Sequence, residues 1–128
     1  MLSELPSTEV LLHGDFWPPN LLESARGQYV AIDGFPSWGD PTYDAARWLV
    51  WSEDHLATTA QSLNSRITVF GESLSYSTEQ ILRWMLPLAV DKHIAHHTYQ
   101  LDGFGEPHQR LGSSKLLKIV AKRTGLQP

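Results

Sequence analysis

Hydrophobic residues occur at two different spacings along this chain, and the change of spacing divides the chain into two parts. Near the N-terminus, short apolar runs at residues 9–12, 20–22 and 28–32 are bounded by Pro, Ser, Gly and Asp, which is typical of short β-strands. A turn at 25–27 joins the second and third runs, and the segment 33–39, which contains Gly, Pro and Ser, is expected to be a loop. The first part is therefore predicted to be a small β-ribbon.

Apolar residues in the rest of the chain recur every three or four positions, which is the period of one face of an α-helix. This spacing predicts four helices, at residues 43–51, 56–70, about 77–99 and about 113–124. Ser77 and Gln80 resemble a capping box that opens the third helix, and Pro87 inside that helix predicts a kink.

The ends of the predicted helices carry further signals. Asp40 followed by Pro41 favours a helix start, because Asp accepts hydrogen bonds from free N–H groups and proline lacks the N–H that would stay unpaired. Gly71 and Gly125 are expected to end the second and fourth helices. Residues 1–128 are thus predicted to form a single domain of the α+β class, mostly helical, with a small β-ribbon followed by about four helices.

Composition and charge exclude several classes of function. The 128 residues are 41% hydrophobic and 19% charged, close to globular averages, so we expect one folded domain. A net charge of -4 gives no electrostatic reason to bind nucleic acid or an anionic membrane. The chain has no cysteine, no apolar run long enough to span a membrane and no signal-peptide pattern, so a cytoplasmic protein is expected. Acidic residues gather in the first half, which suits a divalent cation or a cationic ligand.

Polar residues in two segments, 13–20 and 32–44, are not explained by packing. Asp15 follows a predicted strand, Asn20 lies five residues later, and Asp33 follows the next pair of strands. Phosphoryl transfer needs an oriented hydroxyl and cations that neutralise the phosphates. A carboxylate such as Asp15 can accept the proton of that hydroxyl, and Asn20 and Asp33 offer the hard oxygen ligands that Mg²⁺ prefers. The layout is typical of a phosphoryl-transfer catalytic loop.

These segments resemble the aminoglycoside phosphotransferase family of kinase-like enzymes, and within it the streptomycin-type and hydroxyurea-type antibiotic phosphotransferases. The matching motifs lie within residues 11–51 and are His13-Gly14-Asp15, Asn20, Ile32-Asp33 and Gly39-Asp40-Pro41-x-x-Asp44. The resemblance implies an ATP-dependent small-molecule kinase whose acceptor is a hydroxyl of an aminoglycoside or related antibiotic. It also implies Asp15 as the catalytic base, and Asn20 and Asp33 as ligands of a Mg²⁺ cofactor.

The resemblance implies supporting roles for further residues. His13 and Gly14 match positions that keep the catalytic loop in shape, His13 through a hydrogen bond inside the lobe. Asp40 and Asp44 lie at the start of the predicted helix, from which an acidic side chain braces the catalytic loop in related kinases. Trp17, inside the loop, is the aromatic residue expected to border the substrate.

The family's N-terminal lobe, with its phosphate-covering loop and lysine, has no counterpart here, since only eight residues precede the first predicted strand. We therefore expect a partial C-terminal lobe that is inactive alone, with catalytic and metal loops at 11–51 and a helical part at 53–128. Residues 2–5 resemble the end of a helix. An apolar face left exposed is expected to be covered in a homo-oligomer or by the missing lobe.

Other interpretations stay open. The chain is alternatively a non-catalytic binding or interaction module, or a truncated remnant of such a kinase. His93, His96 and His97 share one predicted helix, and His93 has the spacing of a metal-binding pair with either neighbour. No Glu or Cys nearby in sequence completes a set, so a partly packed helix face is the simpler interpretation of these histidines.

Overall fold

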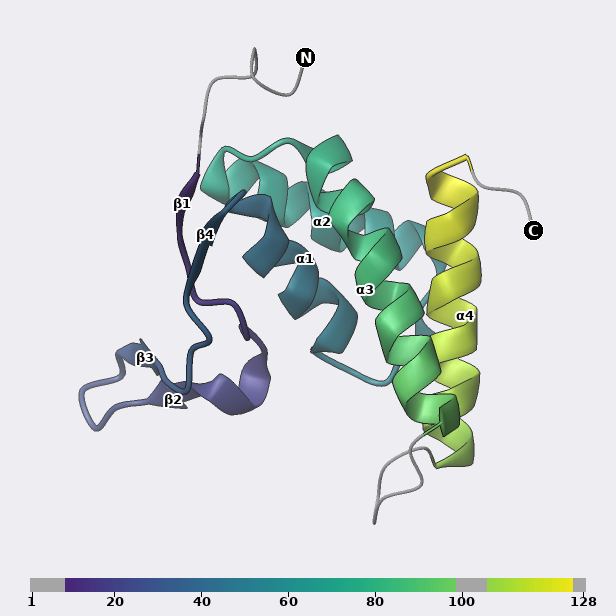
Figure 1. Ribbon diagram of the computed structural model, residues 1–128, viewed down its shortest axis with the longest axis horizontal. Coiled ribbons are helices and arrows are strands. Elements are labelled where there is room, and N and C mark those ends of the chain that lie inside the picture. Colours follow the sequence, from purple (N-terminus) through teal and green to yellow (C-terminus); the bar gives the residue numbers. More distant parts are fainter. Residues whose placement is uncertain (1–8, 99–105, 126–128) are drawn as a thin grey trace.

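The computed structural model describes residues 9–98 and 106–125. The elements in chain order are β1 (Val10–Leu12), the 3-10 turn η2 (Pro18–Asn20), β2 (Leu21–Glu23), β3 (Tyr29–Ala31), β4 (Ser37–Gly39), α1 (Thr42–Trp51), the 3-10 turn η3 (His55–Ala57), α2 (Ala60–Leu74), α3 (Thr78–Thr98) and α4 (Pro107–Arg123). Short strands lie on one side of the molecule and helices on the other (Figure 1). The predicted α+β, mostly helical class is confirmed. The expectations for residues 2–5 and for a helix end near residue 99 lie outside the described residues.

The β part consists of two separate antiparallel pairs of three-residue strands. β1 pairs with β4, so that Leu11 lies opposite Trp38, and β2 pairs with β3. The prediction that 33–39 is entirely loop was wrong, because Ser37–Gly39 forms β4. This segment has no alternation of its own, and its strand conformation depends on pairing with the distant β1. A Cβ atom at Gly39 would lie 2.9 Å from Leu12 Cδ1, so the glycine makes room for this packing.

Helix α1 begins as the Asp-Pro pair predicted. Pro41 already has helical dihedral angles, with φ -59° and ψ -24°, and the Asp40 carboxylate accepts a hydrogen bond from the Thr42 N–H at 2.9 Å. Helix α3 begins where expected, and the Ser77 hydroxyl accepts from the Gln80 N–H at 3.2 Å. Pro87 lies inside α3, and the kink expected there stays a prediction.

Helix α2 begins and ends four residues later than predicted, at 60 and 74 instead of 56 and 70. Its start is set by Thr59, which forms a capping box with Ser62. Gly71 does not end the helix. A Cβ at Gly71 would lie 2.6 Å from Thr78 Cγ2, so this glycine permits close approach of the next helix. The left-handed residue that ends α2 is Ser75, with φ 56°.

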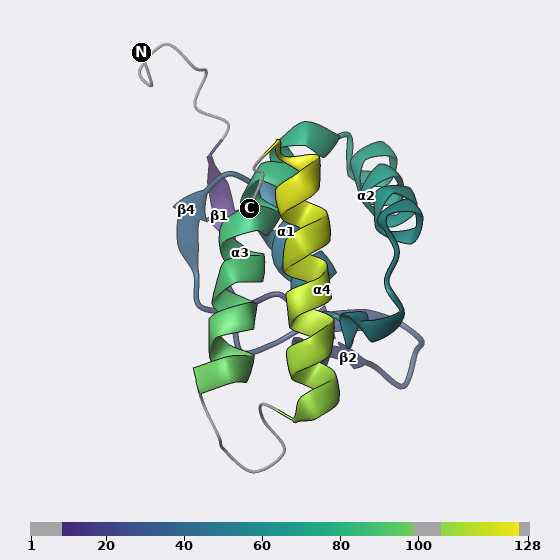
Figure 2. The same cartoon turned by 90° about the vertical axis from the view of Figure 1, so that its right-hand side faces the viewer.

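Helix α4 begins at Pro107, six residues before the predicted start at 113. Glu106 and Gln109 form a capping box, and Pro107 occupies the first turn, where its missing N–H costs nothing. The predicted stop is confirmed, since Gly125 follows the helix with φ +80°. Helices α3 and α4 run side by side in opposite directions (Figure 2).

The hydrophobic core lies between the helices, and each helix contributes a stripe to it. The buried members are Ala45, Ala46, Leu49 and Val50 of α1, Leu63 and Ile67 of α2, Ile81, Met85, Leu88 and Ala89 of α3, and Leu116 and Val120 of α4. Because one side of α1 is buried against the other helices, the helix forms a firm base for the loops that contact its other side.

Two titratable side chains are buried where α1 ends. The Lys92 ammonium donates hydrogen bonds to the carbonyls of Val50 and Glu53, both at 2.8 Å, and so satisfies carbonyls that the helix leaves free. His55 is fully buried, and its Nε2 lies 2.8 Å from the Val50 carbonyl, to which it donates. Burial lowers the pKa of Lys92 to about 8, and burial together with the Lys92 charge lowers the pKa of His55 to about 4.

We expect His55 to make the fold sensitive to acid. Its pKa is 6.5 in an unfolded chain and about 4 here, so between these values the unfolded state binds the proton first. The free energy of unfolding should therefore fall as pH drops from 6.5 to 4, by about 3 kcal/mol from this group. Urea unfolding followed by circular dichroism, compared between His55→Asn and the unaltered chain at each pH, isolates this contribution. An identical pH dependence in the two proteins would contradict it.

Candidate active site

The loop after β1 is held by a carboxylate from helix α1. The N–H of His13 donates to Asp44 Oδ2 at 2.8 Å, and the N–H of Gly14 donates to Asp44 Oδ1 at 3.1 Å. Both N–H groups point at the first turn of α1, where a negative charge is stabilised by the helix dipole. Asp44 therefore braces the backbone of the predicted catalytic loop, as the motif implied.

His13 joins this loop to the loop after β3. Its Nδ1 accepts from the Asp15 N–H at 3.3 Å, so the ring proton is on Nε2, which donates to the Ile32 carbonyl at 2.8 Å. The His13 carbonyl in turn accepts from the Phe35 N–H at 2.8 Å. Gly14 has φ +82°, and a Cβ there would lie 1.9 Å from the Phe35 oxygen. Only glycine allows the two loops to lie this close.

Asp15, Asn20 and Asp33 are brought together by the fold. The buried Asn20 side chain donates from Nδ2 to the Asp15 backbone oxygen at 2.9 Å and to Asp15 Oδ2 at 3.1 Å. The same nitrogen lies 3.5 Å from the Asp33 backbone oxygen. The Ile32 N–H donates to the Asn20 carbonyl at 2.8 Å, which places Asp33 beside Asn20. Asp33 itself has a left-handed backbone, with φ 51°.

Arg47, on α1, is a site residue that the sequence analysis did not identify. Its Nη2 lies 2.7 Å from Asp15 Oδ1, and its guanidinium stacks over the Trp51 ring at 4.6 Å. The Asp15 side chain is 39% exposed, so this ion pair leaves the carboxylate accessible. A signal was available, because Arg47 follows Asp44 by three residues and so shares its side of the helix.

Asp40 and Trp17 make contacts with other parts of the molecule, and their predicted roles stay predictions. The Asp40 carboxylate accepts four hydrogen bonds from side chains and backbone of helices α1 and α3, and it makes none of these bonds with the loop after β1. The donors are the Thr42 N–H, the Thr42 hydroxyl, Gln80 and Trp84. Burial raises the pKa of Asp40, but these hydrogen bonds outweigh it and lower the pKa below its usual value. Trp17 packs edge-on against Trp51, at 6.4 Å between ring centres, and is not among the residues that line the hollow beside Asp15.

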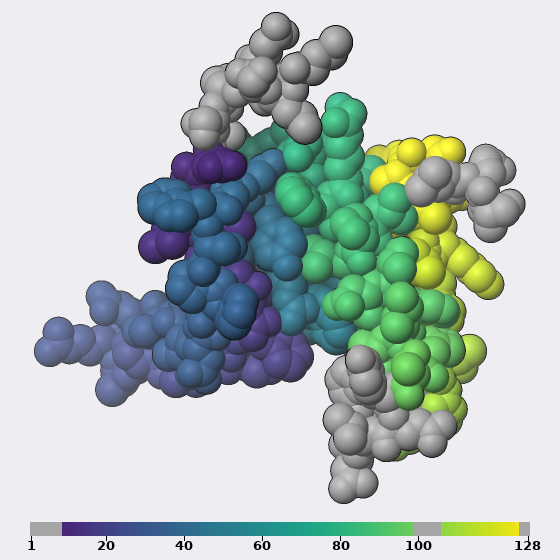
Figure 3. All heavy atoms as spheres, in the orientation of Figure 1, coloured from purple at the N-terminus to yellow at the C-terminus, as the bar shows by residue number. Residues whose placement is uncertain are grey.

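An open hollow of about 340 Å³ lies beside Asp15, between the two loops and helices α1 and α3. Its lining residues are Gly14, Asp15, Phe35, Tyr43, Arg47, Leu88 and Asp91. In the surface view the loop side, in purple and blue, stands beside α3, in green, and the β2–β3 hairpin projects away from both (Figure 3). The hollow therefore has a carboxylate on each wall, Asp15 on the loop and Asp91 on α3.

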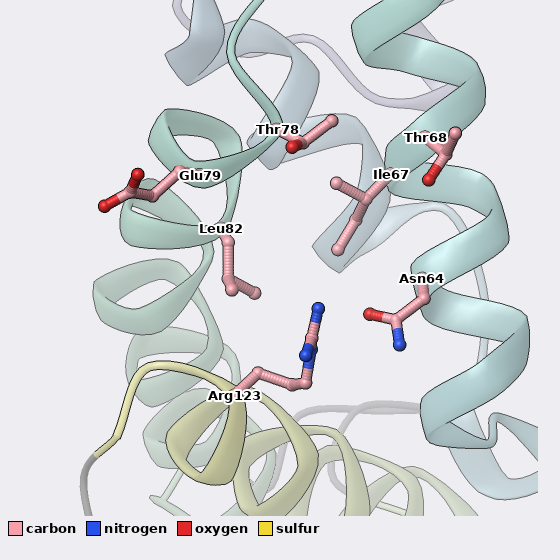
Figure 4. Close-up of a pocket in the computed structure, with 7 residues that line it drawn as sticks. All are labelled: Asn64, Ile67, Thr68, Thr78, Glu79, Leu82 and Arg123. Atoms are coloured by element: carbon pink, nitrogen blue, oxygen red, sulfur yellow. The ribbon is translucent and has the colours of Figure 1, made fainter.

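A second hollow, of about 240 Å³, lies between α2, α3 and the end of α4, and the Arg123 guanidinium points into it (Figure 4). None of the site residues predicted from the sequence lines it. It is therefore separate from the chemistry proposed for the catalytic loop.

The donor atoms near Asp15 suit a hard divalent cation. Nδ2 of Asn20 makes the hydrogen bonds described above, so its amide oxygen is left for a ligand, and the neighbouring acidic residue is Asp33, whose backbone oxygen lies 3.5 Å from that nitrogen. Carboxylate and amide oxygens, completed by phosphate oxygens and water, are what Mg²⁺ binds in phosphoryl-transfer sites. No group of three or more His, Cys, Asp or Glu gathers as a metal site in the described parts of the chain. The oxygen set thus fits an ion that shares its coordination with a nucleotide.

Comparison with known proteins agrees with this geometry. The model of the aminoglycoside/hydroxyurea antibiotic resistance kinase family matches residues 1–97, which include both loops and every site residue predicted from the sequence. The chain belongs to this kinase family. No curated protein and no solved structure gives a significant match to it. In the described residues of this kinase-family chain, no helix is both long and apolar enough to cross a membrane.

We predict that the loop after β1 of this kinase-family chain does not tolerate Gly14→Ala. The added Cβ would meet the Phe35 carbonyl at 1.9 Å, and the left-handed φ adds strain. We expect a loss of about 4 kcal/mol in the free energy of unfolding. Gly27→Ala is the matched control, because φ is +71° there but nothing lies within 4 Å, so about 1–2 kcal/mol is expected. Equal losses for the two variants in urea unfolding would contradict the steric argument.

Proposed function

We propose that this chain provides the catalytic centre of an ATP-dependent phosphotransferase that acts on a hydroxyl of a small antibiotic, an aminoglycoside or a compound related to hydroxyurea. The observation that carries the proposal is the arrangement of Asp15. Arg47 and Asn20 each hold one of its oxygens, and the carboxylate stays accessible from a hollow large enough for part of a small acceptor. Family membership supports the kinase chemistry.

The roles follow from position. Asp15 accepts a hydrogen bond from the acceptor hydroxyl and takes its proton, while the hydroxyl oxygen bonds to the γ-phosphorus of ATP and ADP leaves. Arg47 keeps the Asp15 carboxylate oriented toward the hollow. Asn20 and Asp33 would hold Mg²⁺, which when bound neutralises charge on the phosphates. His13, Gly14 and Asp44 keep the loop backbone in place for these groups.

Asp91 suits recognition of a cationic acceptor. It lines the hollow from α3, across from the loop that carries Asp15. An acceptor with an amino or guanidino group can pair with Asp91 while its hydroxyl reaches Asp15. Tyr43, which also lines the hollow, offers a ring for the acceptor to pack against.

The nucleotide needs more positive charge than this site provides. Of the described residues that line the hollow, Arg47 alone is cationic. We propose that a nucleotide-covering lobe docks on the surface beside the loops, where Leu11, Phe35 and Trp38 are 63%, 80% and 71% exposed. Burial of these side chains would favour the contact, which would also place cationic groups near Asp33. ATP and the absence of cysteine suit a cytoplasmic reaction.

The same apolar surface favours a second candidate, a non-catalytic interaction module. In that case the chain keeps the fold and uses Leu11, Phe35 and Trp38 to bind another protein, without phosphoryl transfer. The two candidates differ in whether Asp15 matters to a chemical product.

We predict that the chain alone, incubated with ATP and Mg²⁺, phosphorylates streptomycin or hydroxyurea only at a very slow residual rate, because the nucleotide lacks its covering lobe, and that Asp15→Asn lowers this residual rate by a further factor of about 10² to 10⁴. The asparagine keeps the shape and the hydrogen bond to Asn20 but cannot take a proton at neutral pH. Product is measured by mass spectrometry, and ATP binding by calorimetry with Asp33→Ala as the control for the metal site.

The outcomes separate the candidates. A product that requires Asp15 supports the kinase. ATP binding that requires Asp33 but yields no product means that the catalytic role is wrong for this chain alone. Absence of both product and ATP binding favours the interaction module.

We predict that Asp91→Asn raises the KM for a cationic acceptor about fivefold with little change in kcat, because it removes one exposed ion pair from binding and leaves Asp15 intact. Glu72→Gln on α2 removes an equal charge away from the hollow and is the control. The KM for an uncharged acceptor such as hydroxyurea should not change. A fall in kcat with unchanged KM would assign Asp91 a different role.

A further inference from the structure

The three histidines of α3 separate into two environments. His96 is buried, with its Nδ1 3.1 Å from the Gln109 carbonyl and its ring edge-on to Trp51. His93 and His97, four residues apart, lie on another side of the helix with ring centres 4.1 Å apart. Only these two are therefore placed as a pair.

Helix α4 supplies a third polar group to this pair. The Ser114 hydroxyl oxygen lies 3.3 Å from His93 Nδ1 and 3.5 Å from His97 Nε2. One nitrogen of each ring is thus directed at the same hydroxyl. Two side chains from α3 and one from α4 converge on a single point.

The hydrogen bond of His97 to the backbone fixes which nitrogen of the neutral ring faces Ser114. Its Nδ1 lies 2.8 Å from the His93 backbone carbonyl, and since a carbonyl only accepts, Nδ1 carries the proton. Nε2 then has a lone pair directed toward Ser114. Metal-binding histidines characteristically donate their other N–H to a carbonyl in this way. Burial, and secondarily the charge of His97, lowers the pKa of His93 and favours its neutral form.

The spacing matches a coordination shell. Tetrahedral ligands about 2.1 Å from Zn²⁺ lie about 3.4 Å from one another. The two separations measured to Ser114 Oγ, 3.3 Å and 3.5 Å, agree with that value. We infer that His93 and His97 bind a divalent transition-metal ion, Zn²⁺ in the first instance, with the Ser114 hydroxyl beside it. Imidazole ligands select such ions over Mg²⁺, so this site differs in kind from the oxygen set at Asn20 and Asp33.

The ion would join α3 to α4. Because both helices supply groups to it, binding stabilises the folded chain by mass action. At a free Zn²⁺ concentration about 100 times the Kd, we expect the Tm to rise by about 8 °C.

The test uses the full chain without a histidine tag, stripped of metal. Zn²⁺ should raise the Tm of the unaltered chain, while Mg²⁺ at the same concentration should not. His93→Gln and His97→Gln should each abolish the Zn²⁺-dependent rise, and Ser114→Ala should weaken Zn²⁺ binding by about tenfold in calorimetry. His108→Gln is the matched control, because that histidine is exposed and pairs with Asp54.

A Zn²⁺-dependent rise that persists in both His93→Gln and His97→Gln, or that is lost in His108→Gln, would overturn the inference, as would no binding by the unaltered chain. The NMR signals of the histidine rings, recorded with and without Zn²⁺, give a second test that needs no variant. Zn²⁺ should shift the ring signals of His93 and His97 and leave those of His108 in place, and the reverse pattern would refute the site.

Discussion

The paired hydrogen bonds from the His13 and Gly14 N–H groups to Asp44 are the interaction on which the site depends. The strands of the β part are three residues long and form two separate pairs, so they cannot hold a loop rigidly by themselves. Asp44 holds the loop in their place, and Asp44 is itself fixed on α1. A charge-assisted contact to two backbone N–H groups fixes the loop's direction as well as its distance. Asp15 follows Gly14 directly in the sequence, so this contact also determines the position of Asp15.

Helix α1 can serve this purpose because its other end is held equally well. Lys92 and His55 bind the carbonyls where α1 ends, and the stripe from Ala45 to Val50 is buried against the other helices. The cost is two titratable groups in a dry environment, each with a lowered pKa. The position of Asp15 therefore depends on the loop, on Asp44, on α1 and finally on the packing of the core. Acid acts on this series of contacts at His55, at the other end of α1 from the loop.

Sequence signals predicted those features that are encoded locally. The Asp40-Pro41 start of α1 and the stop at Gly125 need only neighbouring residues, and the loop motifs carry their own spacing. Strand β4 was missed because it forms only through pairing with β1. Gly71 was wrongly predicted to end α2, because a glycine is needed there for close contact with Thr78 and not for a helix end. Arg47 was missed although its spacing from Asp44 was a local signal, and its contact with Asp15, 32 residues away, is tertiary. Strand β4 and the packing at Gly71 depend on tertiary contacts, which no local pattern encodes.

Three consecutive residues of α3 serve three different surroundings, because successive side chains on a helix point about 100° apart. Asp91 lines the hollow beside Asp15, Lys92 enters the core at the end of α1, and His93 turns toward Ser114 of α4. The position of this one turn therefore determines three features together. These are the wall of the hollow opposite Asp15, the hydrogen bonds at the end of α1 and the contact with α4. A metal ion that joins His93 to His97 would restrain the same turn. Its binding would then be felt at Asp91 by way of the helix itself, with no need for contact between the ion and the acceptor.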